Sequence, residues 1–559
     1  MERIMKIFNK EFSKIGEAAI MLAFLTLLSQ FLGIFRDRFL SGRIGTGETL
    51  DMYYAAFRVP DLLLVFGASL VSVSILMPFF TKKLTNSKEE AKKFIDDIFT
   101  TFFSFIIIIS LVLLVIMPFL IKILFPGFNE ELIIQTTQLS RIMLLSPILL
   151  GISNLFATIT QTFKRFFVYA ITPVFYNIGI IIGIIFFYPV FGVYGLAYGV
   201  ILGALMHLAI QLPVVLREGF LPKISWDIKW KQVLDVVKHS LPRTITLSLS
   251  KIVFIVFVSI ASTMIAGTIS VFQFSYNLQS VPLAIIGISY SIAAFPILVG
   301  YFNEKKHDEF MSHVMSPIRQ IVFWSLPVIS LFIILRAQIV RVILGTGNFD
   351  WSDTRLTAAS LALFIISVVA QSIVFLLIRA YYAAGKTWKP FWINLFASSF
   401  TVIFAFLFLY IFNTYDSFRI FFENLLRIRD VEGSSVVMLS LAYSVGMFLN
   451  LFIFWKAFKK DFTYKKGVYG IRKSFIQSFA ASMIIGIVAY GMLQLTDSWF
   501  GQNTTIDVFG HGFVSGVVGI VVGGLFLVFV KNKETEVFLK TVKRKFWKKK
   551  VYGSLGQNL

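Results

Sequence analysis

The stretch that decides the fold is FFSFIIIISLVLLVIMPFLI, residues 102–121, which runs for twenty residues without a charge. A helix of that length rises about 30 Å, the thickness of the hydrocarbon core of a bilayer. Similar apolar runs recur along the chain. They predict an all-α integral membrane protein with about fourteen transmembrane helices, at residues 17–35, 50–80, 96–121, 132–162, 168–188, 192–216, 241–262, 268–299, 317–336, 355–384, 390–412, 434–457, 474–495 and 508–530.

The composition agrees with lipid as the solvent. Of 559 residues, 57% are hydrophobic and 15% are charged, whereas soluble proteins carry about 25% charged residues. The absence of cysteine excludes disulfides, thiolate metal sites and a cysteine nucleophile. A net charge of +22 would suggest nucleic acid for a soluble domain, but Lys and Arg gather here in alternate loops. We therefore expect no nucleic-acid partner.

The basic loops predict the topology. They follow predicted helices 2, 4, 6, 8, 10 and 12, and they hold Lys82-Lys83, Lys164-Arg165, Lys223/Lys229/Lys231, Lys305-Lys306, Lys386/Lys389 and Lys459-Lys460/Lys465-Lys466. Cytoplasmic loops carry the excess of Lys and Arg. We expect a multi-pass protein of the cell (inner or plasma) membrane with both termini cytoplasmic. The basic N-terminus (Arg3, Lys6, Lys10, Lys14) and the basic tail fit this orientation.

An internal repeat divides the chain. At an offset of about 217–220 residues, Pro173-x-x-x-Asn177 recurs as Pro390-x-x-x-Asn394, Pro78 as Pro296, and the turn at 127–130 as the turn at 347–350. Six helices per repeat give two lobes of equal orientation, as in transporters with alternating access. We expect an N-terminal lobe at 1–216, a C-terminal lobe at 217–458, two further helices at 459–530 and a basic cytoplasmic tail at 531–559.

Polar side chains on the predicted helices mark a candidate site, because such groups are costly in hydrocarbon unless they face a partner or water. The stripes lie on helices 1, 2, 7 and 8, and their main members are Ser29, Arg36, Asp37, Asp51, Tyr54, Arg58, Asp61, Lys251, Gln273 and Asn277. Pro60 should kink the second helix. Since helices 1 and 7, and 2 and 8, are equivalent in the repeat, one central cavity between the lobes is expected.

Lys251 lies about ten residues from either end of helix 7, roughly 15 Å along the axis, too far for its stem to reach the headgroups. It either lines a cavity or pairs with an acid that the sequence does not identify. Arg36 with Asp37 is either a salt bridge closing the first helix or part of the site. Arg58 either pairs with Asp51 and Asp61 on its own helix or grips a phosphate, which the planar guanidinium suits.

Other chemistries have no support in the sequence. No His-Glu-x-x-His or other metal spacing occurs, and the five histidines offer no hydrolase constellation. His207, alone in helix 6, is better explained as a buried structural histidine than as a proton relay. We expect no catalytic residue, no metal and no cofactor, so the chain is not expected to be an enzyme.

Two blocks resemble a known family. The first comprises LGIFRDR at 32–38, GTG at 45–47 and LDMYYAAFRVPD at 50–61, and the second comprises GNFD at 347–350 with RAYY at 379–382 and GKT at 385–387. Together they are similar to the MurJ (MviN) lipid II flippases of the multidrug/oligosaccharidyl-lipid/polysaccharide exporter superfamily.

The resemblance implies fourteen helices, a cationic central cavity for an undecaprenyl-pyrophosphate headgroup, and a groove by the last two helices for the lipid tail. Carried over by position, Ser29, Arg36, Asp37, Asp51 and Ser270 match functional positions of the family. Three family arginines correspond to Gln30, Leu64 and Asn277, and a family glutamate corresponds to Ser69. Lys251 and Arg58 are candidates to replace the lost charge, and Asn277 stays in the predicted substrate site.

The function expected is translocation of lipid II to the outer leaflet by alternating access, with the chain working as a monomer. A flippase for another polyprenyl-pyrophosphate-linked oligosaccharide, of the O-antigen type, is the alternative that the missing arginines favour. A multidrug cation antiporter should have an acidic cavity, unlike this one. A scaffold that recruits partners through its basic tail is the remaining reading.

Overall fold

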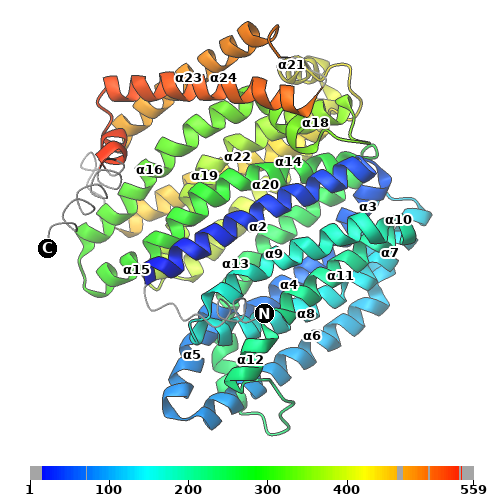
Figure 1. Ribbon diagram of the computed structural model, residues 1–559, viewed down its shortest axis with the longest axis vertical. Helices are drawn as coiled ribbons and strands as arrows, with labels where there is room; N and C mark the ends of the chain where they lie inside the picture. The colour runs from blue at the N-terminus through cyan, green and yellow to red at the C-terminus, as the bar shows by residue number, and fades with distance from the viewer. Residues whose placement is uncertain (1–14, 71, 463–469, 501–503, 541–542, 544–559) are drawn as a thin grey trace, which may run out of the picture.

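The computed structural model describes residues 15–70, 72–462, 470–500, 504–540 and 543, and within these ranges all regular structure is helical (Figure 1). The N-terminal basic residues, Lys465-Lys466 and most of the tail cations lie outside the described residues. Apolar side chains form these helices because only a helix satisfies every backbone hydrogen bond within one segment in lipid. The predicted all-helical class is confirmed.

The first half of the chain contains α2 (Ile15–Ile44), α3 (Glu48–Ala56), α4 (Arg58–Leu70), α5 (Val73–Asn86), α6 (Lys88–Leu124), α7 (Glu130–Met143), α8 (Leu145–Thr162), α9 (Phe166–Ile182), η1 (Gly183–Phe187), α10 (Tyr188–Phe191), α11 (Val193–Ala209) and α12 (Leu212–Glu218). In α6, Ser87 caps the N-terminus by accepting a hydrogen bond from the Glu90 N–H. This helix begins eight residues before the predicted span at 96–121.

The second half contains α13 (Trp230–Ser262), α14 (Thr268–Leu283), η2 (Ala284–Ile288), α15 (Ser289–Asn303), α16 (His307–Ile334), α17 (Arg336–Leu344), α18 (Trp351–Ile366), α19 (Val368–Ala383), α20 (Trp388–Thr414), α21 (Asp416–Leu426), α22 (Val436–Asp461), α23 (Ile471–Thr496) and α24 (Thr505–Phe529). Residues 533–540 add a last helical segment after α24. The sequence did not predict α17 or α21.

The number of spans that the structure supports is eleven, or twelve with the pair α18–α19, whose axes bend by 42°. Each of them coincides with a predicted span. The predicted span at 17–35 falls on α2, part of whose side chains lie outside the description. The predicted span at 50–80 falls on α3, α4 and α5, where Asp51, Arg58 and Asp61 interrupt the apolar run. Fourteen was therefore more than the described helices support by length and hydropathy.

The break between α3 and α4 has a local cause. Pro60 has no N–H to donate and its ring clashes with the carbonyl of residue 56, so the helix ends at Ala56 and restarts at Arg58. The Asp61 N–H donates to the Phe57 carbonyl at 2.8 Å and begins the new ladder. Phe57 keeps helical angles, with φ of −69° and ψ of −21°, so the predicted kink corresponds to a break of one residue between α3 and α4.

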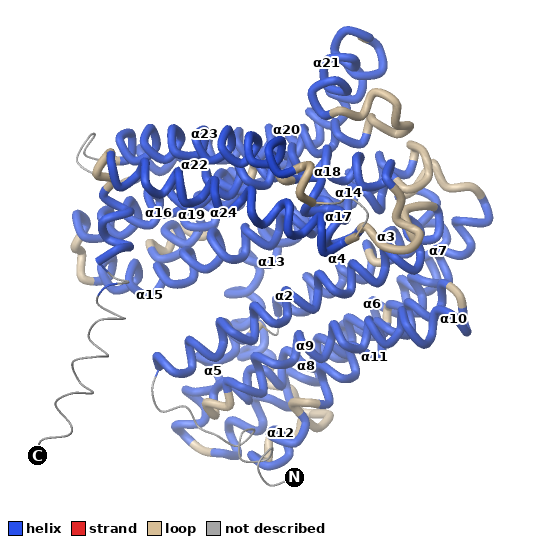
Figure 2. Tube along the Cα trace, turned by 45° about the horizontal axis from the view of Figure 1, so that its top comes forward, coloured by secondary structure: helices blue, strands red, loops and turns tan. Residues whose placement is uncertain are grey.

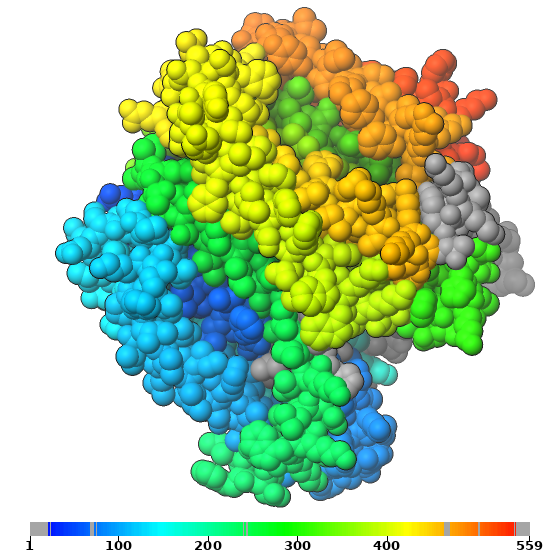
Figure 3. Space-filling model, turned by 180° about the vertical axis from the view of Figure 1, so that it is seen from behind, coloured from blue at the N-terminus to red at the C-terminus, as the bar shows by residue number. Residues whose placement is uncertain are grey.

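The two halves of the chain lie side by side, and the gap between their helices opens toward α5 and α15 in Figure 2. The space-filling view places blue and cyan residues on one side of the back face and yellow and orange residues on the other (Figure 3). The helix α13 packs against α4 of the first half and α20 of the second. It thus joins the halves near the candidate site, as does α14, which packs against α3.

Candidate functional site

A chain of hydrogen bonds connects α2 with α14. Arg36 and Asp37 form an ion pair, with Nη2 2.8 Å from Oδ1. The other carboxylate oxygen of Asp37 accepts a hydrogen bond from Asn277 Nδ2 at 2.8 Å. Because α2 runs on to Ile44, the pair lies inside the helix, not at its end as the simpler interpretation assumed. Asp37, 5% exposed, therefore holds a cation of one half and an amide of the other.

The chain of bonds continues at both ends. On one side, Arg36 Nη1 lies 3.5 Å from Asn177 Oδ1, and Asn177 Nδ2 donates to Ser29 Oγ at 3.3 Å. The sequence analysis noted Asn177 only as part of the repeated Pro-x-x-x-Asn motif. That motif was the signal for it, since Asn177 also donates to the Pro173 carbonyl at 3.0 Å.

On the other side, Gln273 links the network to Arg58. Gln273 Nε2 donates to Asn277 Oδ1 at 2.7 Å, and Arg58 Nη2 donates to Gln273 Oε1 at 2.6 Å. Arg58 is 7% exposed and lies over the ring of Phe254, with 4.8 Å between the guanidinium carbon and the ring centroid. Among the described residues it has no ion pair, and its Nε has no hydrogen-bond partner. Arg58 is a buried cation held by a neutral amide and an aromatic face.

Lys251 forms an ion pair with an acidic residue, Asp61. Its Nζ lies 3.1 Å from Asp61 Oδ2, which joins α13 to α4. The two side chains are 43% and 34% exposed, so the pair remains accessible although it lies mid-helix. The alternative in which Lys251 pairs with an acid therefore fits this contact, its lining of a cavity stays a prediction, and Asp61 is paired with Lys251 and not with Arg58. Three cations, Arg36, Arg58 and Lys251, face two carboxylates, which leaves one positive charge uncompensated.

Asp51 lies apart from this cluster. Its carboxylate accepts hydrogen bonds from the N–H groups of Gly267 and Ser270, both at 2.7 Å, and from the Ser270 hydroxyl. It therefore caps the N-terminus of α14 from the other half of the chain, where the helix dipole favours a negative charge. Asp51, 4% exposed, thus meets the same helix as Arg58, which contacts Gln273 of α14, whereas Asp61 of the predicted stripe meets Lys251 of α13. Ser270, 0% exposed, belongs to the same cap.

Close to this cap, α2 and the turn at 345–350 form a tight contact between the halves. Ser41 Oγ donates to the Leu344 carbonyl at 2.8 Å, and the Asn348 N–H donates to the Gly42 carbonyl at 3.0 Å. The approach is so close that a Cβ on Gly347 would lie 2.0 Å from the Gly42 oxygen. We call this the 42–347 contact.

An equivalent contact lies elsewhere between the halves. A Cβ on Gly127 would lie 2.0 Å from the carbonyl oxygen of Ser262, at the end of α13. Gly127 and Gly347, like Gly42 and Ser262, are separated by 220 residues, the offset of the sequence repeat. Each half thus presses a glycine turn onto the end of the first long helix of the other half.

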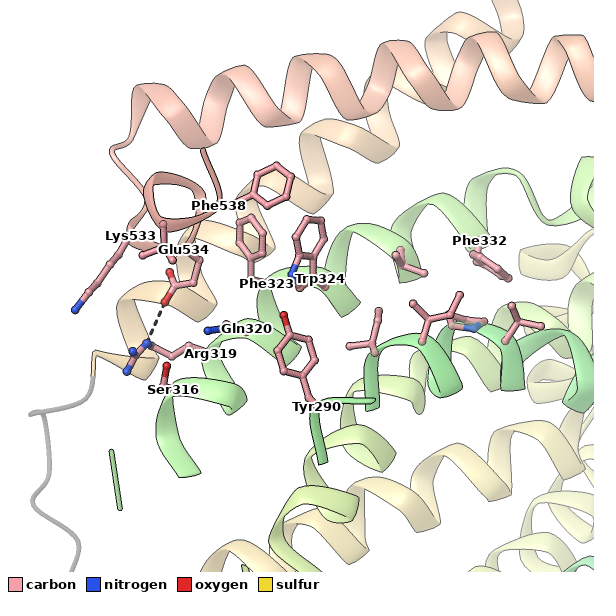
Figure 4. A pocket seen from close by; sticks show the side chains of 16 residues that line it. Tyr290, Ser316, Arg319, Gln320, Phe323, Trp324, Phe332, Lys533, Glu534 and Phe538 are labelled. Atoms are coloured by element: carbon pink, nitrogen blue, oxygen red, sulfur yellow. Dashed lines mark hydrogen bonds and ion pairs between the residues drawn. The ribbon is translucent and has the colours of Figure 1, made fainter. Parts of the chain in front are cut away.

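A cavity of about 860 Å³ lies beside α16, away from the charged cluster (Figure 4). Its walls come from α14, η2, α15, α16 and the segment 533–540, and they include Ile285, Phe323, Phe332 and Val537. The resemblance placed a groove by the last two helices. That groove stays a prediction; the cavity beside α16 takes part of its lining from the segment that follows α24, which the sequence analysis assigned to the tail.

The structure also places His207 and bears on the expectation about metal ligands. His207 Nδ1 lies 2.7 Å from Ser153 Oγ, a structural arrangement between α11 and α8. The described residues contain no group of three or more His, Asp or Glu that could hold a metal ion. The side chain of Ser69 is outside the description.

Comparison with known proteins identifies the family. The family model "Lipid II flippase MurJ" matches residues 40–509. The chain belongs to the MurJ family. Curated relatives include a "Probable lipid II flippase MurJ" of Rhizobium tropici, 26% identical over 395 residues (68% of this chain and 72% of that one), and another of Buchnera aphidicola subsp. Schizaphis graminum, 24% identical over 541 residues (94% and 99%).

Solved structures agree on the fold of this MurJ family member. "Lipid II flippase MurJ, inward closed conformation" superposes with a TM-score of 0.73 at 23% identity, covering 92% of this chain and 99% of that one. An inward-facing multidrug resistance MATE transporter of the MOP superfamily gives 0.61 at 15% identity, covering 79% and 99%. The recognition of the family from the two sequence blocks is confirmed, and the MATE transporter shares the fold. The MurJ family is one of transporters, so the expectation that the chain is not an enzyme is confirmed as well.

Proposed function

We propose that the chain translocates lipid II, a polyprenyl-pyrophosphate-linked cell-wall precursor, from the cytoplasmic to the outer leaflet by alternating access. The observation that carries the proposal, beside the family, is the charged cluster between the halves. Arg36, Lys251 and Arg58 lie there with one charge uncompensated, and the side chains of Arg36 and Lys251 are 25% and 43% exposed. Such groups lower the cost of moving a diphosphate through a layer where bare charge is expensive.

The lobes of this transporter would be residues 1–216 and 217–458, with 459–530 and the tail beside the C-terminal lobe. The paired glycine contacts at Gly127 and Gly347 support this division, because they follow the repeat offset. The basic loops support an orientation with both termini in the cytoplasm. In that orientation the 42–347 contact and the Asp51 cap close the outer side.

The substrate site would comprise Ser29, Arg36, Asp37, Arg58, Lys251 and Asn277, with Asp51 and Ser270 acting on closure and not on the headgroup. The membrane potential is a sufficient drive. Two negative charges moving outward gain about 2.3 kcal/mol each per 100 mV, inside negative.

The test is rescue of cells depleted of their native lipid II flippase, read as growth and as lipid II reaching the outer leaflet. The parent chain should restore both. Lys251→Glu should abolish both, whereas Lys82→Glu, an exposed charge reversal on α5, should not. An inserted and expressed parent chain that restores neither would contradict the proposal. Equal rescue by Lys251→Glu would favour a scaffold over a transporter.

A different lipid-linked oligosaccharide is the second candidate, and one observation favours it. Asn277, at the place of a family arginine, meets Asp37 with a neutral amide, so the cluster is only one charge from neutral. A less anionic headgroup than that of lipid II would suit it. Native mass spectrometry of lipids that copurify with the chain separates the two cargoes by mass.

A further inference from the structure

The cavity beside α16 is apolar along most of its length and polar at one end. Figure 4 shows Ser316, Arg319, Gln320 and Lys533 near one end, and Phe332 at the other. Thirteen residues separate Arg319 from Phe332 on α16, so the cavity extends for about 20 Å of helix. This shape and polarity fit an unbranched or isoprenoid chain that carries one polar group at its end.

The polar end contains a cation that is shielded from water. Arg319 Nε lies 3.0 Å from Glu534 Oε1, and the two side chains are only 16% and 8% exposed. A buried pair of this kind contributes little net stability, because desolvation offsets the attraction. Stability therefore does not explain why this ion pair lies on the wall of an apolar cavity.

The glutamate is held in place by its own segment. Asn532, 1% exposed, donates to Gln477 Oε1 on α23 at 2.9 Å, and its Oδ1 caps the segment 533–540 by accepting from the Glu534 N–H at 3.0 Å. Phe538 of the same segment packs edge-on against Trp324 of α16, with ring centroids 5.4 Å apart. The segment is docked at both ends, so Glu534 is presented to Arg319 by a built structure.

We propose that Arg319 binds the phosphate of a polyprenyl-phosphate lipid whose chain occupies the cavity, and that Glu534 is the internal carboxylate that this phosphate displaces. Guanidinium binds carboxylate and phosphate oxygens with the same planar fork, so one can replace the other. The inference rests on the proposed function for the choice of an isoprenoid anion. It adds a site outside the central cluster and a role for the first residues of the tail.

The experiment measures binding of decaprenyl phosphate and of neutral decaprenol to the purified full-length chain by native mass spectrometry. Glu534→Gln removes the competing carboxylate, and it should bind decaprenyl phosphate about tenfold more tightly. Arg319→Gln should bind it about tenfold less tightly, the scale expected for one charged hydrogen-bonding group. The double variant should behave as Arg319→Gln. Lys533→Gln, a charge removed from the same lining without the ion pair, is the matched control and should change binding less than threefold.

Binding of neutral decaprenol shows which part of the proposal is wrong if the expected result is not obtained. Its binding should be the same in the parent chain and in all four variants, which also shows that the cavity remains folded. If decaprenol binds and the phosphate shows no dependence on Arg319 or Glu534, the phosphate site is refuted while the proposed function stands. If neither lipid binds the parent chain, the lipid-chain assignment of the cavity is refuted. Displacement of decaprenyl phosphate by an equal amount of phosphatidylglycerol would refute the isoprenoid assignment.

Discussion

Replacing Gly347 by alanine tests whether the 42–347 contact must form during transport. Gly347 has φ of +56°, a left-handed conformation that costs an alanine about 1–2 kcal/mol. Its Cβ would also lie 2.0 Å from the backbone oxygen of Gly42, so α2 and the turn must separate. Overpacking of this kind costs about 1–3 kcal/mol. Together the two effects reach about 2 kcal/mol at least, which disfavours the closed arrangement by about 30-fold or more.

The assay uses the absence of cysteine from the chain. Asn348 Nδ2 donates to the Arg43 carbonyl at 2.9 Å, so residues 43 and 348 approach each other at the contact and are the positions chosen for a pair of cysteines. In an otherwise unchanged chain this pair should form a disulfide readily in membranes. Gly347→Ala should lower both the yield of that disulfide and the rate of transport.

Two further alanine variants separate strain from collision. Gly385 has φ of +71°, and nothing lies within 4 Å of its added Cβ, so Gly385→Ala carries the strain without the collision. It should crosslink and transport like the parent. Gly127→Ala brings the collision at the equivalent contact without positive φ, and should impair transport. Parent-like crosslinking and transport in Gly347→Ala would refute the requirement for this contact.

Three further outcomes are expected. Lys251 and Asp61 form a half-exposed pair, so exchanging them (Lys251→Asp with Asp61→Lys) should change the free energy of unfolding by less than about 1 kcal/mol. Transport should still be lost in this variant; if transport were retained, only the pairing of the two charges would matter. Asp51→Ala removes a carboxylate that accepts two backbone N–H bonds, each worth about 1.5–3 kcal/mol, so it should reduce disulfide formation between positions 43 and 348 without altering lipid binding. Arg58→Gln removes the uncompensated charge and should weaken binding of a pyrophosphate lipid about tenfold or more in native mass spectrometry, with the affinity of Arg58→Lys in between. Equal affinities of the parent chain and Arg58→Gln would exclude Arg58 from the site.

The sequence was sufficient for the spans because hydrocarbon demands apolar residues over a fixed length. It was insufficient for α3 to α5, where polar residues and Pro60 interrupt the apolar run and the chain breaks into pieces. Helical periodicity placed Asp51 and Asp61 on one face because it assumed a continuous helix. In the structure Asp51 meets α14 and Asp61 meets α13. The spacing of residues along a helix does not say which neighbouring helix each of them contacts.

Contacts between distant segments of the chain could not be predicted from the sequence either. The sequence required a partner for Lys251 but offered several acids, and only the packing of α13 on α4 selects Asp61. Glu534 followed the last predicted span and was assigned to a solvated tail. Its pairing with Arg319 depends on Asn532 reaching α23, a bond between residues 55 apart. Arg319 itself, a charge inside the predicted span 317–336, was a signal that the polar stripes did not include.

The charge balance of the cluster bears directly on how cargo and movement are coupled. A diphosphate that reaches Arg36 meets a guanidinium already paired with Asp37, and Asp37 also holds Asn277 across the two halves. A diphosphate that displaced Asp37 from Arg36 would leave a 5% exposed carboxylate without its cation, an expensive state in a low-dielectric setting. Movement of α2 away from α14 relieves that state by exposing the carboxylate to water. A cluster with excess free cations would bind the anion more tightly in one conformation and gain nothing from moving. In the proposed transport cycle, displacement of Asp37 in a near-neutral cluster would disfavour the closed arrangement. That is the differential interaction that a transported ligand needs in order to shift a conformational equilibrium.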